Sequence, residues 1–128
     1  MLVTIDAASE RPIYEQIADS VRRSIASGQL RAGAKLAPAA DIATGLDVNK
    51  HTVLRAYQLL RDEGLVDLRR GRGAVVTSLA SEVERLQREA ARIAERARAL
   101  GISGRTLAAM FDAPPVLALD SSKGAFNA

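Results

Sequence analysis

The sequence predicts a mainly α-helical fold that contains one small β-hairpin and ends in a short two-helix region. Apolar residues recur at helical spacing in several stretches, two β-rich runs flank a glycine-containing connection, and residues 81–100 carry a heptad-like pattern. The chain has 128 residues, of which 48% are hydrophobic, enough for one small domain with an appended region.

Composition excludes several classes of protein. The chain has no cysteine and one histidine, so we expect no disulfide framework, no metal site and no cofactor. The N-terminus lacks a signal-peptide pattern, and no apolar run is long enough to span a membrane, so we expect a cytoplasmic protein. The net charge of +3 is only weak support for a polyanionic partner, and the placement of the basic residues carries more information.

The first helix is predicted from Pro12 to about Ser27. Pro12 suits a first helical turn, and Gly28 suits the position after the last. Before this helix, residues 2–5 fit a short strand or a flexible lead, and after it residues 28–36 form a loop or a short extended tip. One apolar stripe runs along the helix through Ile13, Ile17, Val21 and Ile25.

Two more helices follow with a tight connection. Pro38 opens the first, at 39–45, and the second runs from Asn49, a good N-cap, to Gly64, which suits the left-handed position past a helix end. A short helix, a turn and a longer helix with a basic face are typical of a helix-turn-helix. An ordinary helical hairpin with a solvated basic face is the alternative.

A β-hairpin directly after the second helix of such a pair is a wing. Residues 65–68 and 74–77 are strand-like, and the connection between them holds three arginines and two glycines. Arginine can neutralise phosphates or enter a narrow minor groove, whereas the alternative is a hairpin kept soluble by its charged tip. The predicted DNA-binding residues are Asn49, Lys50, His51, Thr52, Arg55, Arg69, Arg70, Gly71, Arg72 and Gly73.

The last part of the chain predicts dimerisation. Ser81 and Glu84 match a capping box at the start of a helix that Gly101 ends, and Ser103 caps a shorter helix. The predicted division is a winged helix-turn-helix domain at 1–79, a helical dimerisation region at 80–112 and a flexible tail at 113–128. The predicted dimer residues are Val83, Leu86, Ala90, Ile93, Ala97, Leu100, Leu107 and Phe111.

The order of these elements resembles the DNA-binding domain of the GntR family of bacterial transcription regulators. The short C-terminal part is similar to the YtrA-type subgroup, whose tail region mainly dimerises. The resemblance implies a regulator, on analogy a repressor. Family members often carry arginine where this chain has Ala40, Lys50 and Leu54, which implies fewer DNA contacts here. The matching segments are 12–17 (PIYEQI), 28–30 (GQL), 52–53 (TV), 55–57 (RAY), 63–66 (EGLV) and 70–73 (RGRG).

Two other functions compete with DNA binding. An enzyme is not expected, because the sequence shows no catalytic set and residues 70–73 are too short for a nucleotide-binding loop. A helical protein-interaction module that acts through 81–100 without specific DNA binding is the alternative function. The expected partners are double-stranded DNA, bound at an inverted repeat, and a second copy of the chain. The sequence identifies no small-molecule effector, and any effector should act through the relation between subunits.

Overall fold

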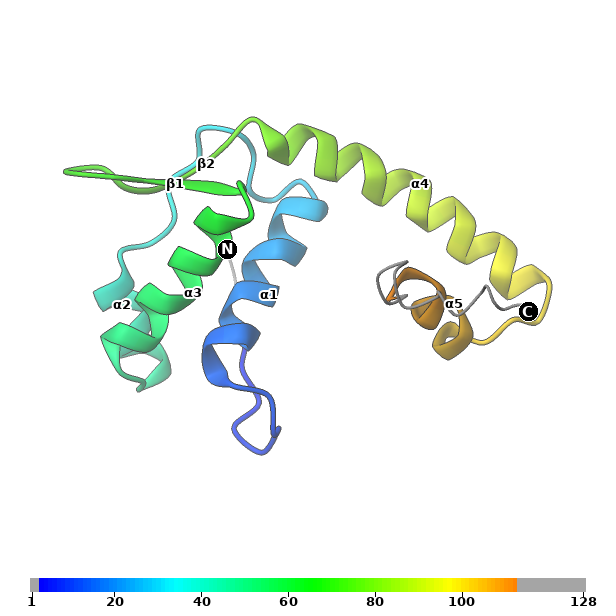
Figure 1. Cartoon of the computed structure of the whole chain (residues 1–128), viewed down its shortest axis with the longest axis horizontal. Helices are drawn as coiled ribbons and strands as arrows, with labels where there is room; N and C mark the ends of the chain where they lie inside the picture. The colour runs from blue at the N-terminus through cyan, green and yellow to red at the C-terminus, as the bar shows by residue number, and fades with distance from the viewer. Residues whose placement is uncertain (1–2, 113–128) are drawn as a thin grey trace, which may run out of the picture. The chain divides into compact units, whose positions relative to one another are not determined.

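The computed structural model describes residues 3–112, in two compact units that divide between Glu89 and Ala90. Helix α4 is continuous across this division, and α5 belongs to the second unit. Within the described residues, no helix combines the length and the apolar character needed to cross a lipid bilayer. The elements are α1 (Ile13–Ala26), α2 (Ala39–Leu46), α3 (Lys50–Asp62), β1 (Val66–Arg69), β2 (Gly73–Val76), α4 (Leu79–Ala99) and α5 (Gly104–Phe111) (Figure 1).

Helix α3 is the centre of the first unit and packs against α1, α2 and β1. The apolar stripes predicted for α1 and α3 form most of this core. Burial of each large aliphatic side chain contributes about 1.5–3 kcal/mol, so these positions dominate the stability of the unit. The side chains with no exposed surface are Ile17, Ala18, Val21, Ile25, Val53, Ala56 and Leu60.

The ends of the helices in the first unit follow local sequence signals. The Asn49 side-chain oxygen accepts the His51 backbone N–H at 2.7 Å, as expected for an N-cap. Gly28 and Gly64 follow α1 and α3 with φ of 84° and 83°, a conformation that favours glycine. Asp47 ends α2 in the same left-handed region, with φ 56°. The predicted helix pair is therefore confirmed, with α2 ending one residue beyond 45.

The hairpin is antiparallel, with Val66 opposite Val76 and Arg69 opposite Gly73. A third segment lies along the other edge of β2, because the N–H of Leu36 donates to Ala74 O at 2.9 Å and the N–H of Val76 donates to Ala34 O at 2.8 Å. The prediction of a loop or a short extended tip at 28–36 is thus right for residues 33–36, which are extended along β2. Its pairing with the hairpin, including a bridge between Lys35 and Val75, was not predicted.

The N-terminal segment is neither a strand nor a free lead. Residues 3–6 have irregular backbone, and Val3 and Ile5 pack against the core. The Ser20 hydroxyl bonds both the N–H and the carbonyl of Thr4, at 3.3 and 3.2 Å. Two polar side chains of α1 therefore hold this segment: Ser20 bonds the backbone of Thr4, and Gln16 bonds the backbone of Asp6.

Helix α4 begins at Leu79, so the capping box predicted for Ser81 is wrong. The Thr77 hydroxyl accepts the Leu79 N–H at 3.4 Å and donates to Gly64 O at 2.6 Å, which moves the start of the helix towards the hairpin. Ala80 is buried and Val83 packs against the core of the first unit. The first compact unit therefore extends to Glu89, whereas the sequence predicts a boundary after residue 79.

The second unit contains the end of α4 and the helix α5. Gly101 turns the chain with φ 78°, and the Ser103 hydroxyl accepts the Thr106 N–H at 3.1 Å, as predicted for an N-cap. The predicted tail at 113–128 lies outside the described residues.

Candidate DNA interface

The start of α3 presents polar and basic groups to solvent. Lys50 and His51 are exposed in its first turn, and Thr52 is half-buried. Asn49 is also exposed, but its side-chain oxygen is occupied by the cap, which leaves its amide N–H groups for a ligand. The opposite side of α3 is buried, so this helix can offer only the one face to a partner.

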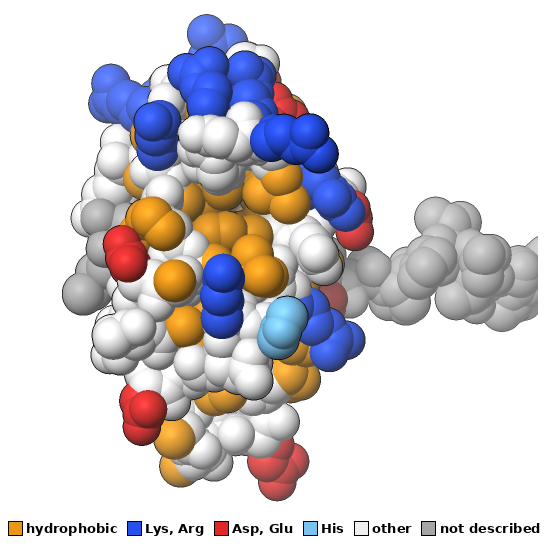
Figure 2. Space-filling model, turned by 90° about the vertical axis from the view of Figure 1, so that its left-hand side faces the viewer, with side chains coloured by type: hydrophobic (Ala, Val, Ile, Leu, Met, Phe, Trp, Pro, Cys, Tyr) orange, Lys and Arg blue, Asp and Glu red, His pale blue; other side chains and the backbone are white. Residues whose placement is uncertain are grey.

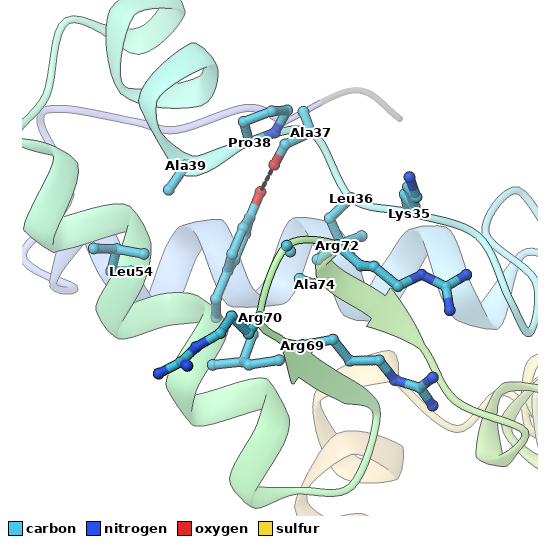
Figure 3. A pocket seen from close by; sticks show the side chains of 14 residues that line it. Lys35, Leu36, Ala37, Pro38, Ala39, Leu54, Arg69, Arg70, Arg72 and Ala74 are labelled. Carbon is cyan, nitrogen blue, oxygen red and sulfur yellow. Dashed lines mark hydrogen bonds between the residues drawn. The ribbon is translucent and has the colours of Figure 1, made fainter.

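The tip of the hairpin is an exposed basic segment of the first unit. Arg69, Arg70 and Arg72 are all exposed, and Figure 3 shows the Arg69 and Arg72 side chains extending in one direction and Arg70 in the other. Gly71 and Gly73 have φ of 80° and 74°, and no atom lies near the position of a Cβ on either residue. The tip is thus a narrow turn that can approach another backbone closely.

An open groove of about 770 Å³ separates the hairpin from α3 and the start of α2 (Figure 3). Its floor is mainly apolar and its rim on the hairpin side is basic. Lys35 belongs to this rim, and we did not predict it from the sequence. The three-residue alternation of half-buried Ala34, exposed Lys35 and buried Leu36 was too short to be recognised as a strand. The lining residues are Lys35–Ala39, Leu54, Tyr57 and Leu68–Ala74.

Tyr57 anchors the floor of the groove. Its hydroxyl donates to the backbone carbonyl of Ala37 at 2.5 Å, which ties the segment before α2 to α3. Burial, with a smaller contribution from the charge of Asp41, raises the pKa of Tyr57 to about 12. The phenol is therefore neutral at physiological pH and keeps its proton in this hydrogen bond.

Four basic side chains on this side have no carboxylate partner among the described residues, whereas Arg69 pairs with Asp67. Among residues 3–112, no carboxylate lies within 4.0 Å of a nitrogen of Lys35, Lys50, Arg70 or Arg72, whereas Arg22 pairs with Asp19 and Glu63. On α4, Arg85, Arg88 and Arg98 pair with glutamates of the same helix. Figure 2 shows basic side chains at the top of this face, above an apolar area, with further basic side chains and the histidine lower on the same face. Unpaired cations around an apolar surface suit a polyanion.

Arg55 has a contact that the sequence did not reveal. Its guanidinium lies 4.0 Å from the centre of the Tyr14 ring on α1, the geometry of a cation–π interaction. The side chain thus connects two helices of the core, and its predicted role in DNA binding remains a prediction.

We expect Arg55→Ala to lower the free energy of unfolding by about 0.5–1 kcal/mol, the usual value of an exposed cation–π contact. Chemical denaturation of the purified protein measures this change. Lys50→Ala is the matched control, since Lys50 lies on the same helix without such a contact, and it should leave stability unchanged. Equal effects of the two substitutions would contradict a structural role for Arg55.

The predicted dimer residues are exposed to different degrees. Leu86, Ile93, Leu100 and Phe111 have relative exposures of 62%, 42%, 71% and 66%. Ala90 and Leu107 are half-buried, and Ala97 is buried. Val83 differs from the other predicted dimer residues, because it packs on the core of the first unit. Within the second unit, a small apolar groove of about 220 Å³ is lined by Ile93, Arg96, Ala97, Leu100, Ile102, Leu107 and Met110.

A three-helix core, an exposed basic helix and a hairpin with an arginine-rich tip define a winged helix-turn-helix DNA-binding protein. The family model described as "Bacterial regulatory proteins, gntR family" matches residues 13–76. The chain therefore belongs to the GntR family of bacterial regulatory proteins.

Relatives bear out the resemblance to YtrA-type members. The HTH-type transcriptional repressor YtrA of Bacillus subtilis strain 168 is 36% identical over 76 residues, which cover 59% of this chain and 58% of that protein. YhcF of the same organism is 34% identical over 79 residues, which cover 62% of this chain and 65% of that protein. The chain therefore spans about three fifths of the length of these relatives.

Two solved structures extend the likeness. YtrA from Sulfolobus acidocaldarius, a GntR-family transcription factor, has 36% identity and a TM-score of 0.56, covering 86% of this chain and 93% of that one. A GntR family transcriptional regulator from Listeria monocytogenes has 29% identity and a TM-score of 0.58, covering 84% of this chain and 97% of that one. The winged helix-turn-helix fold with C-terminal helices is thus shared with known regulators.

Proposed function

We propose that this protein is a homodimeric transcriptional repressor that binds an inverted-repeat operator. The observation that carries the proposal is the combination, in one chain, of an unneutralised basic face in the first unit and exposed large apolar side chains along α4 and α5. The first feature suits DNA and the second suits a second copy of the chain.

The dimer follows from the apolar side chains that the described residues leave uncovered. Leu86 and Ile93 on α4 and Leu100 directly after it recur at spacings of seven, and Phe111 adds a large ring on α5. Burial of one such side chain contributes about 1.5–3 kcal/mol, so the set from two copies can outweigh the entropy lost on association. Because Val83 already packs on the first unit, we exclude it from the interface.

The inverted repeat follows from two-fold symmetry. A dimer with a two-fold axis presents two copies of α3 in opposite orientations, so its operator reads the same on both strands. Helix α3 with Lys50 and His51 then contacts the major groove, and Arg70 and Arg72 contact the flanking backbone or minor groove. The repressor assignment is supported by the name of the Bacillus YtrA relative.

Selection of bound fragments from random DNA by the purified protein tests this proposal. We expect enrichment of an inverted repeat whose half-site centres lie about 10 base pairs, or one helical turn, apart. The same selection with Lys50→Ala should change the base preference within each half-site and keep the spacing, since the spacing depends on the dimer. Enrichment of an asymmetric site would contradict the two-fold arrangement, and no enrichment would favour the interaction module.

A further inference from the structure

The groove between α3 and the hairpin differs in character at its two edges. The hairpin edge carries Arg69, Arg70 and Arg72, with Lys35 beside it. The α3 edge is formed by only two side chains, Leu54 and Tyr57. The helix that faces the bases therefore meets this groove with an apolar surface, whereas the basic groups lie across from it.

Leu54 is the side chain at this edge that a base can reach. It is half-buried, and it lies one helical turn after Lys50 and three residues after His51, so it shares the exposed side of α3 with both. Tyr57 is buried, and its only hydroxyl proton is held by Ala37 O. The α3 edge thus offers a base the methyl groups of Leu54 and no free hydrogen-bond donor.

The major groove of DNA presents a single apolar group, the C5-methyl of thymine. The other edge groups of the bases are hydrogen-bond donors or acceptors, which lose water without compensation against a leucine. Leu54 also packs against the core of the first unit, which holds its methyl groups in place before DNA arrives. We propose that Leu54 is a specificity-determining residue that selects thymine in each half-site by contact with its C5-methyl group.

This inference rests on the proposed function, and its test uses the operator obtained by selection. Each thymine of that operator is replaced in turn by deoxyuracil, which keeps all hydrogen bonds and removes only the methyl group. We expect one thymine per half-site at which the replacement weakens binding of the wild-type protein about fourfold, the equivalent of one buried methyl group. Leu54→Ala should bind the thymine and deoxyuracil versions of that site equally.

Two variants control for indirect effects. Leu54→Met keeps an apolar side chain of similar length, so it should retain the preference for thymine over deoxyuracil. Leu59→Ala makes the same truncation on the same helix, at another half-buried residue that packs against the core and does not line the groove. It should leave the deoxyuracil profile unchanged, even if it lowers stability.

The outcomes separate this inference from the proposed function. Failure to enrich any DNA sequence would overturn both. An operator with no methyl-sensitive thymine, or a methyl-sensitive position that persists in Leu54→Ala, would overturn the assignment of Leu54 and leave the operator itself established. The assignment of Leu54 would be established by a thymine whose methyl group strengthens binding of the wild-type, Leu54→Met and Leu59→Ala proteins but not of Leu54→Ala.

Discussion

Replacement of both Leu86 and Ile93 by glutamate is expected to produce a monomer that remains folded and loses most of its affinity for the operator. Leu86 is 62% exposed and Ile93 is 42% exposed within one chain, and Ile93 lies in the second unit, so their replacement removes little of the packing inside the first unit. At a dimer interface the introduced carboxylates would be desolvated and would face like charges across the two-fold axis. A monomer holds one half-site at a time and forfeits the gain of about 100-fold or more that linkage of two sites provides.

Sedimentation and titration of the operator measure the two effects. Ala91→Glu with Ala99→Glu is a matched control, since it adds the same two charges to exposed positions of α4 outside the predicted seam. The control should stay dimeric and bind the operator with little change. If the Leu86 and Ile93 variant is dimeric and binds normally, the interface lies elsewhere on the chain.

Removal of two wing arginines, Arg70→Ala with Arg72→Ala, should weaken binding to every DNA sequence. Neither guanidinium is neutralised by a carboxylate among the described residues, so both are available to phosphates. The dimer carries two copies of each arginine, so the double variant loses four phosphate contacts and lowers the slope of log affinity against log salt by about four, and loss of Arg72 alone lowers it by about one per subunit. The same relation gives a loss of about 900-fold at 0.15 M salt for the dimer of the double variant.

Binding titrations at several salt concentrations, on operator and unrelated DNA, measure the slope. Arg85→Ala with Arg88→Ala is the control, because these arginines pair with Glu82 and Glu84 on α4. It should leave the slope unaltered. An unaltered slope in the wing variant would remove both arginines from the phosphate contacts, and a loss confined to the operator would indicate that they read sequence.

The elements that the sequence predicted well are those with local signals at both ends. Helix α3 has an N-cap at Asn49 and a left-handed glycine at Gly64, and its apolar stripe identifies the face that is buried. The hairpin has β-rich runs around a glycine-containing tip. Family resemblance then added the function, which the residues alone left open between DNA binding and an ordinary helical hairpin.

The features that were missed depend on contacts between distant segments. Ser81 has the local pattern of a cap, but Thr77, held by its bond to Gly64, starts α4 earlier. Val83 fits the heptad pattern of a dimer interface, but it packs on the core of the first unit, because α4 begins at Leu79 beside that core. The stacking of Arg55 on a ring of α1 likewise has no local sign, since it joins residues 41 positions apart in the chain.

The pairing of residues 33–36 with β2 has a consequence for how the wing meets DNA. Hydrogen bonds fix β2 on both edges, to β1 on one side and to Ala34 and Leu36 on the other, so the base of the hairpin is a narrow three-stranded ribbon. The tip around Gly71 has no such flanking segment, and no atom outside its chain neighbours lies within 4 Å of the position that a Cβ would take on Gly71. Ordering one residue costs about 1–2 kcal/mol of conformational entropy. The ribbon restricts that penalty to the few tip residues, and the attraction of their guanidinium groups for phosphate is large enough to offset it.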